Sequence, residues 1–228
     1  MGSVKQQNMP APLVPGDTKK PPPNLVLDLD NTVVSAVPTE EFPFDNKKII
    51  SPLAKLTLHN MDDYYMVYER PGLQSFLDYI FKNFRVSVWT AASKDYAAFI
   101  IDKILLPKDK SNRKLHWVFC SYHGKLSHKK YKTPKQLKIF WEEWKLPGFN
   151  EKNTIIFDDH PGVKSSQHEI AVHVPDFEVL EKDSADDSYL LQAKKDLQSY
   201  LKEYNMADGQ VENPSRFFSR QQQIEGGE

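Results

Sequence analysis

The stretch that most constrains the fold is residues 24–34, Asn-Leu-Val-Leu-Asp-Leu-Asp-Asn-Thr-Val-Val. Its apolar start follows three prolines and is typical of a buried strand in a parallel sheet. Asp28 and Asp30 come where that strand should end, and the strand period of two turns both toward one side. Thr32 adds a hydroxyl, or simply ties the loop that follows. These residues would also fit an ordinary strand end exposed to solvent, so the choice between a functional site and a solvated strand end depends on the rest of the chain.

Two like charges on a buried strand are costly unless a positive charge compensates them. A divalent cation is one such charge, and hard oxygen ligands suit magnesium. The carboxyl edge of a parallel sheet is also where α/β folds bind ligands. The stretch therefore predicts a magnesium site at that edge.

Composition narrows the class of protein. The chain has 228 residues, a net charge of −1 and a pI of about 6.7, so it lacks the basic field of a nucleic-acid-binding protein. It contains no apolar run long enough to cross a bilayer and no signal-peptide core. Its single cysteine, Cys120, excludes an intramolecular disulfide and favours a reducing compartment, the nucleus or the cytoplasm. No arginine follows soon after Cys120, so we interpret it as a core residue rather than a nucleophile.

The chain divides into one domain with two polar ends. We predict a disordered leader over residues 1–21, a domain over 22–206 and a flexible tail over 207–228. Within the domain, short β-favouring runs around an Asn/Asp-rich turn predict a small β insertion at 42–68.

Strands and helices alternate through the rest of the domain, which predicts an α/β fold with a doubly wound parallel sheet. Residues 85–89 read as a buried strand that ends at Thr90. Residues 154–157 read as another, followed by Asp158 and Asp159. The sheet should therefore bring these side chains and Asp28 to one edge.

A lysine-rich segment at 124–132 precedes a predicted helix. Thr133-Pro134-Lys135-Gln136 fits a capping box with proline at the first helical position. The buried stripe of that helix would consist of Leu137, Phe140, Trp141 and Trp144. A solvated lysine is the default in such a segment, but one could also reach the acidic edge of the sheet.

Taken together, these segments resemble a known family. Asp-x-Asp-x-Thr at 28–32 resembles the first motif of the haloacid dehalogenase (HAD) phosphotransferases. The set is closer still to the FCP/SCP phosphatases, in Leu-Asp-Leu-Asp-Asn-Thr, Tyr-Glu-Arg-Pro-Gly-Leu, Trp-Thr-Ala-Ala-Ser-Lys-Asp-Tyr-Ala, Tyr-Lys-Thr-Pro-Lys-Gln-Leu and Phe-Asp-Asp-His-Pro. Each motif is weak alone, and the set is specific. The resemblance implies a HAD-like fold with the small β insertion after the first motif strand.

The resemblance also implies roles. Asp28 would be the nucleophile that forms an aspartyl-phosphate, and Asp30 the general acid and base. Thr90 and Lys132 would bind the phosphate, with Lys130 as the competing lysine. The Mg²⁺ ligands would be Asp28, Asp30 through its backbone carbonyl, Asp159 and its neighbour Asp158.

Three departures from the family pattern concern substrate identity more than catalysis. Asn31 stands where the family usually has Glu. Asp158-Asp159 stands where it has Asp-Asn, which adds charge but keeps an oxygen ligand. The segment 106–124 is longer and more basic than in the small members.

Three functions remain open. The first is a magnesium-dependent phosphatase of phosphoserine and phosphothreonine in proteins, with substrates such as the RNA polymerase II C-terminal tail. The second is a HAD phosphatase of nucleic-acid ends or small phosphoesters. The third is a HAD-fold binding module without turnover, which would have no physical reason to keep the acidic cluster. We expect a monomer that binds a phosphorylated protein or peptide, with no nucleic-acid or membrane partner.

An aromatic groove beside Asp28 would favour the first function, because it suits an extended, proline-containing peptide. The insertion offers candidates for such a groove, which could equally be its own core: Phe42, Phe44, Tyr64, Tyr65 and Tyr68.

Overall fold

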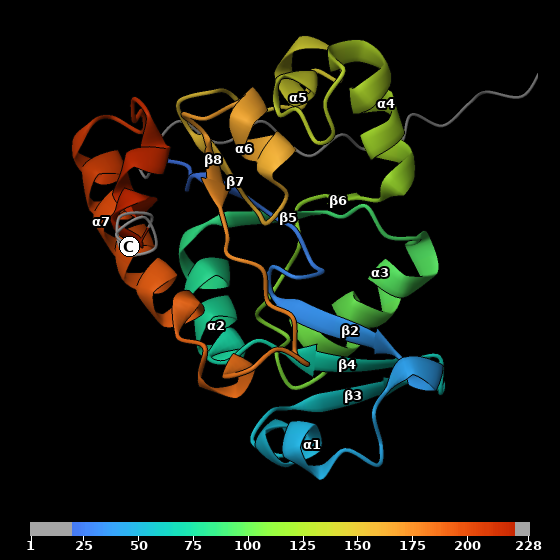
Figure 1. Ribbon diagram of the computed structural model, residues 1–228. Helices are drawn as coiled ribbons and strands as arrows, with labels where there is room; N and C mark the ends of the chain where they lie inside the picture. Colours follow the sequence, from blue (N-terminus) through green and yellow to red (C-terminus); the bar gives the residue numbers. More distant parts are fainter. Residues whose placement is uncertain (1–19, 222–228) are drawn as a thin grey trace, which may run out of the picture.

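A computed structural model describes residues 20–221 and places a five-stranded parallel sheet at the centre (Figure 1). In spatial order the strands are β6 (Val118–Phe119), β5 (Arg85–Trp89), β1 (Asn24–Leu27), β7 (Thr154–Asp158) and β8 (Ala171–His173). The central strand, β1, pairs in parallel with both neighbours, so that Asn24 lies opposite Arg85 and Thr154. The predicted α/β fold with a parallel sheet is confirmed.

Helices cover both faces of this sheet because its strands are apolar on both sides. Leu25 and Leu27 of β1 face one core, whereas Val26 faces the other. The first core is closed by α2 (Leu73–Asn83), α3 (Lys94–Ile100) with its π-helical continuation η2 (Ile101–Leu105), and α7 (Tyr189–Met206). The second lies under α5 (Lys138–Glu142) and α6 (Pro161–Ser166), next to α4 (Ser121–Tyr131).

The insertion is a three-stranded antiparallel sheet with a helix on it. Its strands run in the order β2 (Val34–Pro38), β4 (Tyr65–Glu69) and β3 (Leu58–Met61). A short 3-10 turn, η1 (Thr39–Glu41), and α1 (Lys47–Leu53) connect β2 to β3. The sheet thus begins before the predicted boundary at residue 42, and α1 replaces the β structure expected there. Its own core reaches Phe177 and Val179 in the segment after β8.

The predicted start of the helix at Pro134 is wrong. The lysine-rich segment forms most of α4, and the helix expected to begin at Pro134 begins four residues later, as α5. Lys135 has a φ of 50°, which no helix allows, so the apparent capping box caps nothing.

The predicted flexible tail is also wrong for the part that the structure describes. After η3 (Ser184–Asp186) and α7, the chain returns as η4 (Pro214–Gln221) against the sheet. Val211 and Phe218 are buried in the first core, and the Phe218 ring lies 5.2 Å from that of Phe157. The predicted leader, apart from its last two residues, and the tail from residue 222 lie outside the described residues. Among residues 20–221, no helix is long and apolar enough to cross a membrane.

Candidate active site

The carboxyl ends of β1, β5 and β7 meet at one edge of the sheet and carry the predicted site residues. Asp28 follows β1 directly, and its N–H donates to the carbonyl of Phe157 at 3.0 Å. Asp158 is the last residue of β7, and Asp159 follows it. Thr90 follows β5 and is buried. Parallel pairing in register therefore brings together residues that are up to 131 positions apart in sequence.

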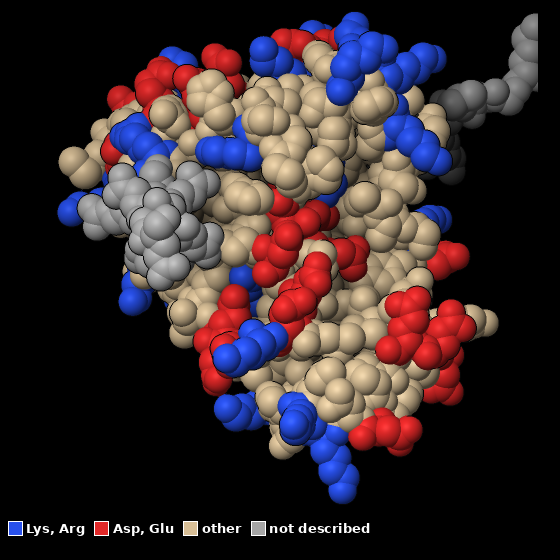
Figure 2. All heavy atoms as spheres, in the orientation of Figure 1, with Lys and Arg blue, Asp and Glu red and all other residues tan. Residues whose placement is uncertain are grey.

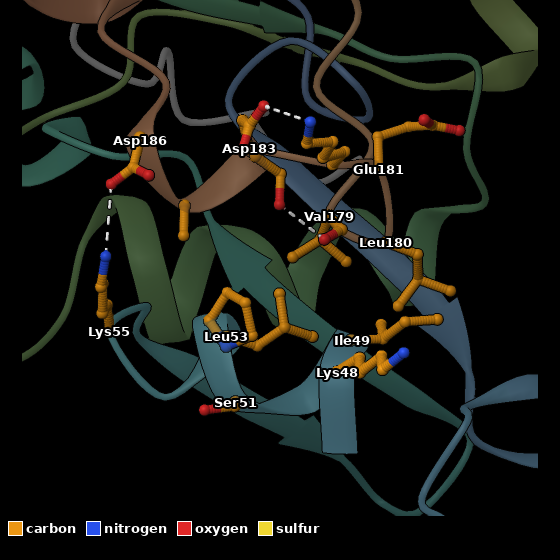
Figure 3. A pocket seen from close by; sticks show the side chains of 14 residues that line it. Lys48, Ile49, Ser51, Leu53, Lys55, Val179, Leu180, Glu181, Asp183 and Asp186 are labelled. Carbon is orange, nitrogen blue, oxygen red and sulfur yellow. Dashed lines mark hydrogen bonds and ion pairs between the residues drawn. The ribbon is translucent and has the colours of Figure 1, made fainter. Parts of the chain in front are cut away.

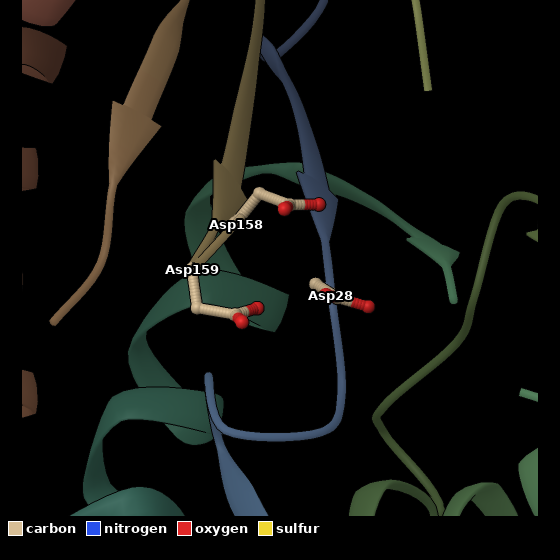
Figure 4. A group of neighbouring side chains, drawn as sticks. All are labelled: Asp28, Asp158 and Asp159. Carbon is tan, nitrogen blue, oxygen red and sulfur yellow. The ribbon is translucent and has the colours of Figure 1, made fainter. Parts of the chain in front are cut away.

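Three carboxylates form the centre of this site (Figure 4). One oxygen each from Asp28, Asp158 and Asp159 lies within 4.8 Å of the others. Asp28 is 6% exposed and Asp158 1%. Burial raises the pKa of Asp28 well above its usual range, the neighbouring Asp158 raises it further, and a nearby lysine opposes both effects. The cluster therefore needs positive charge to stay ionised.

That lysine is Lys135. Its Nζ lies 2.7 Å from Asp28 Oδ2 and 2.7 Å from Asp158 Oδ2, and the residue is 4% exposed. Burial by itself lowers the pKa of Lys135, but the two carboxylates outweigh it and raise the pKa above the usual value. The ammonium thus stays charged, contacts two of the three carboxylates and offsets one unit of their negative charge.

The prediction that Lys132 reaches the site is therefore wrong, and so is the alternative, Lys130. Lys132 is exposed and ends α4 in the left-handed conformation, with a φ of 61°. Lys130 pairs with Glu143 on the surface at 3.0 Å.

Contacts distant in sequence explain why Lys135 points inward. The N–H of Gln136 donates to Ser127 Oγ at 2.8 Å, and that of Leu137 to Gln167 Oε1 at 2.9 Å. The side chain of Gln167 in turn donates to the carbonyl of Lys135 at 2.9 Å. These bonds hold the backbone of 135–137 out of the helix and aim Lys135 at the sheet edge. No local sequence signal could have revealed them.

Asp30 lies beside the cluster but is not one of its three neighbouring carboxylates. Its Oδ1 accepts a hydrogen bond from the hydroxyl of Tyr96, the third residue of α3. Burial raises the pKa of Asp30, although the bond from Tyr96 opposes the shift. Burial and the adjacent Asp30 also raise the pKa of Tyr96, so the phenol remains a donor. That the backbone carbonyl of Asp30 ligates a metal stays a prediction.

The two threonines have separate surroundings. Thr32 is fully buried and donates to Asp159 Oδ1 at 3.1 Å, which holds that carboxylate toward the cluster. The Thr90 hydroxyl accepts from the N–H of Ala92 at 3.0 Å and lines the same hollow as the acids. The structure thus brings Thr90 to the site, and gives Thr32 a defined contact with it.

A cavity of about 340 Å³ opens over these residues, lined among others by Asp28, Asp30, Thr90, Lys135 and Asp159. A second cavity, of about 480 Å³, lies between α1 and the segment around η3 (Figure 3). It is lined by residues such as Leu53, Val179 and Asp186, and by none of the predicted site residues. The cavity of about 340 Å³ is therefore the one lined by candidate catalytic residues.

The donors fit a hard divalent cation. Carboxylate oxygens are the ligands that magnesium prefers, and three approach closely enough to share one ion. Figure 2 shows acidic side chains in a band across this face, between the part with α4 to α6 and the small antiparallel sheet. Magnesium would be held by Asp28, Asp158 and Asp159.

The protein-family model of NLI interacting factor-like phosphatase matches residues 23–212. A CTD phosphatase-like protein of Invertebrate iridescent virus 6 is 43% identical over 181 residues, which cover 78% of this chain and 98% of the relative. The corresponding protein of Invertebrate iridescent virus 3 is 37% identical over 180 residues, covering 77% of this chain and 95% of the relative.

The solved structure of Fcp1, described as an essential RNA polymerase II CTD phosphatase, has a similar fold. It matches with a TM-score of 0.55 at 16% identity, over 85% of this chain and 68% of that chain. At this identity the match concerns the fold alone, and it supports the HAD-like architecture expected from the sequence.

Proposed function

The chain belongs to the NLI interacting factor-like phosphatase family, and on that premise we propose that it is a magnesium-dependent phosphatase of phosphoserine and phosphothreonine in proteins. One observation carries the proposal. Asp28 lines a cavity, with Lys135 Nζ 2.7 Å from its Oδ2 and with carboxylate oxygens of Asp158 and Asp159 within 4.8 Å of its own. A nucleophile beside both a fixed cation and a cation site suits attack on an anionic phosphoryl group.

In the first step, an oxygen of Asp28 bonds to phosphorus and the bond from phosphorus to the serine or threonine oxygen breaks. Asp30 donates a proton to that leaving oxygen. In the second step, Asp30, now ionised, takes a proton from water while the water oxygen attacks phosphorus. The bond to Asp28 breaks, which releases inorganic phosphate and restores both carboxyl groups.

The remaining residues stabilise charge. Lys135 offsets the phosphoryl oxygens and keeps Asp28 ionised. Thr90 offers its hydroxyl proton to a phosphoryl oxygen, since its oxygen already accepts from Ala92. Asp28, Asp158 and Asp159 would hold magnesium, which would supply further positive charge toward the phosphoryl group. The burial that raises the pKa of Asp30 suits a group that must carry a proton near neutral pH.

The choice of a protein substrate rests on the relatives and on surface charge. The two viral relatives are CTD phosphatase-like proteins, and an RNA polymerase tail is one candidate substrate. The acidic band beside the site disfavours polyanionic oligonucleotides. The aromatic groove is only partly available, because Phe42 and Tyr68 are buried in the insertion's core, whereas Phe44, Tyr64 and Tyr65 are exposed.

The test measures hydrolysis of p-nitrophenyl phosphate, a phosphoserine peptide and a 5′-phosphorylated oligonucleotide at equal salt, with magnesium, with calcium or with chelator. We expect turnover of the first two with magnesium, little with calcium because its looser geometry misplaces the nucleophile, and none in chelator. Full activity in chelator would contradict the metal dependence. A clear preference for the oligonucleotide would overturn the substrate class.

A further inference from the structure

The carboxyl group of Asp30 is tied to a residue from a different part of the fold. The Tyr96 hydroxyl donates to Asp30 Oδ1 across 66 positions of sequence. Tyr96 itself is held firmly at the start of α3. Its N–H donates to the Oγ of Ser93, the N-cap of that helix, at 3.3 Å, and its ring is buried. The donor is thus fixed before any substrate arrives.

The acid that protonates a leaving oxygen must lie within hydrogen-bond reach of it, and a free aspartate rotates about two side-chain bonds. A bond from Tyr96 to Oδ1 restricts both rotations. It leaves Oδ2 as the oxygen that carries the proton to the leaving group. The arrangement therefore fixes the acid in direction as well as in place.

The insertion supports this donor from the other side. The ring of Tyr65, on β4, lies 5.7 Å from that of Tyr96 at 81°, an edge-to-face contact. Tyr65 is exposed, whereas Tyr96 is buried. The contact connects the small antiparallel sheet to Asp30 through a single intervening ring.

We propose that Tyr96 is the positioning residue for Asp30, and that Tyr65 holds the Tyr96 ring in place. The inference rests on the proposed function, because it assigns Tyr96 a task only if Asp30 is the general acid. It goes beyond that function by giving the β insertion a part in the chemistry. A merely structural tyrosine would affect all substrates alike.

The test is the dependence of rate on the leaving group. p-Nitrophenol leaves with little help from an acid, whereas the alkoxide of serine has to be protonated as it departs. Tyr96→Phe removes only the hydroxyl. We expect it to lower kcat/KM for a phosphoserine peptide about 10-fold or more, and kcat/KM for p-nitrophenyl phosphate less than about 3-fold, since general acid catalysis contributes about 10²–10⁴-fold. The ratio kcat/KM reports the step that forms the aspartyl-phosphate, before Asp30 acts as the base on water.

Three further variants make the result specific. Tyr79→Phe removes a hydroxyl from a half-buried tyrosine on α2 and is the matched control, expected to leave both rates unchanged. Asp30→Asn removes the acid itself and should give the largest loss on the phosphoserine peptide relative to p-nitrophenyl phosphate. Tyr65→Ala should give a smaller selective loss than Tyr96→Phe, and Tyr65→Phe should recover it because the ring contact returns.

Equal losses on both substrates in Tyr96→Phe, or no loss on either, overturn the assignment of Tyr96 while Asp30→Asn still shows its selective loss. If Asp30→Asn lowers kcat/KM equally for both substrates, Asp30 is not the acid, and the mechanism in the proposed function fails together with the role of Tyr96. In the double variant, Tyr96→Phe should add no selective loss to that of Asp30→Asn, since both residues act on the same proton transfer. Additive losses would separate the two residues and overturn the inference.

Discussion

Lys135 and Arg70 are both buried cations that bind carboxylates, yet the two sites differ in what else satisfies the charge. Arg70 forms a two-pronged pair with Asp187 at 3.0 and 2.8 Å and also donates to the backbone carbonyls of Thr32 and Pro175. Its guanidinium lies over the rings of Phe177 and Tyr189. Lys135 has no such framework. Its described partners are the carboxylates of Asp28 and Asp158, both of which line or adjoin the site.

The difference separates two uses of a buried charge. Arg70 has its donors satisfied by Asp187 and by two backbone carbonyls, none of them from residues that line the cavity, and it joins the loop after β1 to the segment before α7. Lys135 instead neutralises carboxylates that the proposed reaction and its metal also need. A buried cation surrounded by backbone carbonyls and rings therefore indicates structure, and one surrounded only by clustered carboxylates at a cavity indicates chemistry.

The largest expected effect comes from the nucleophile beside Lys135. Asp28→Asn should lower kcat by about 10⁴-fold or more, because an amide cannot form the aspartyl-phosphate. Thermal unfolding should change little, since the substitution also relieves repulsion with Asp158. Steady-state hydrolysis of p-nitrophenyl phosphate and the Tm of the purified variant give both numbers. Activity above a trace of wild type would remove Asp28 from the mechanism.

The next effect concerns the lysine itself. Lys135→Met should lower kcat about 10³-fold, because the phosphoryl charge loses its fixed counter-charge. Lys132→Met, three positions earlier and exposed, is the matched control and should stay within about 2-fold, as surface substitutions usually do. If the control loses as much as Lys135→Met, the assignment of the site lysine is wrong.

Arg70→Met should reverse the balance between activity and stability. The substitution leaves Asp187 and two backbone carbonyls without their hydrogen-bond donor, so we expect the free energy of unfolding to fall by about 3 kcal/mol. Well below its Tm, the variant should keep kcat within about 5-fold of the wild-type value, because none of the residues that Arg70 contacts lines the active-site cavity. Urea unfolding and kcat at 15 °C separate the two. A fall in kcat well beyond 5-fold, with the free energy of unfolding unchanged, would contradict the structural role assigned to Arg70.

The smallest effect tests a third buried cation, Arg113, whose partner is half exposed. Hydrogen bonds from Arg113, with smaller help from Lys110, lower the pKa of Asp78. A lowered folded-state pKa stabilises the fold above the unfolded pKa, and the benefit disappears as pH falls through the folded value. Asp78→Asn should therefore cost less than about 1 kcal/mol at pH 7 and nothing once the pH is well below the folded-state pKa of Asp78. A cost that grows toward low pH has the wrong sign for this explanation.

The sequence revealed the carboxylates but not the lysine, and the reason is the range of the forces involved. Asp28, Thr90 and Asp158 follow apolar strands, so the sheet determines where they meet. Lys135 depends on side chains of Ser127 and Gln167 that replace helix hydrogen bonds in its segment. The local pattern of Thr133 to Gln136 favoured a helix start, and tertiary contacts overrode it.

The prediction for the C-terminal end of the domain was wrong for a related reason. Val211 and Phe218 are isolated apolar residues in a polar stretch, without the periodicity that marks an element. Each fills a gap in a core built by residues much earlier in the chain, such as Phe157. The helix α1 was likewise misjudged, because Ile49 and Ile50 favour strands and become helical only where they pack on the insertion's core.

The central position of β1 has a consequence for how the protein is made. Asn24, at the start of that strand, hydrogen-bonds to Thr154, 130 residues later. A nascent chain therefore exposes one unpaired edge of its central strand on the ribosome until β7 has emerged, and Phe218 must follow before the core closes. Such late pairing makes folding slow and the unfinished chain prone to association. We expect fragments that end between β5 and β7 to accumulate as aggregates and to depend on chaperones during synthesis.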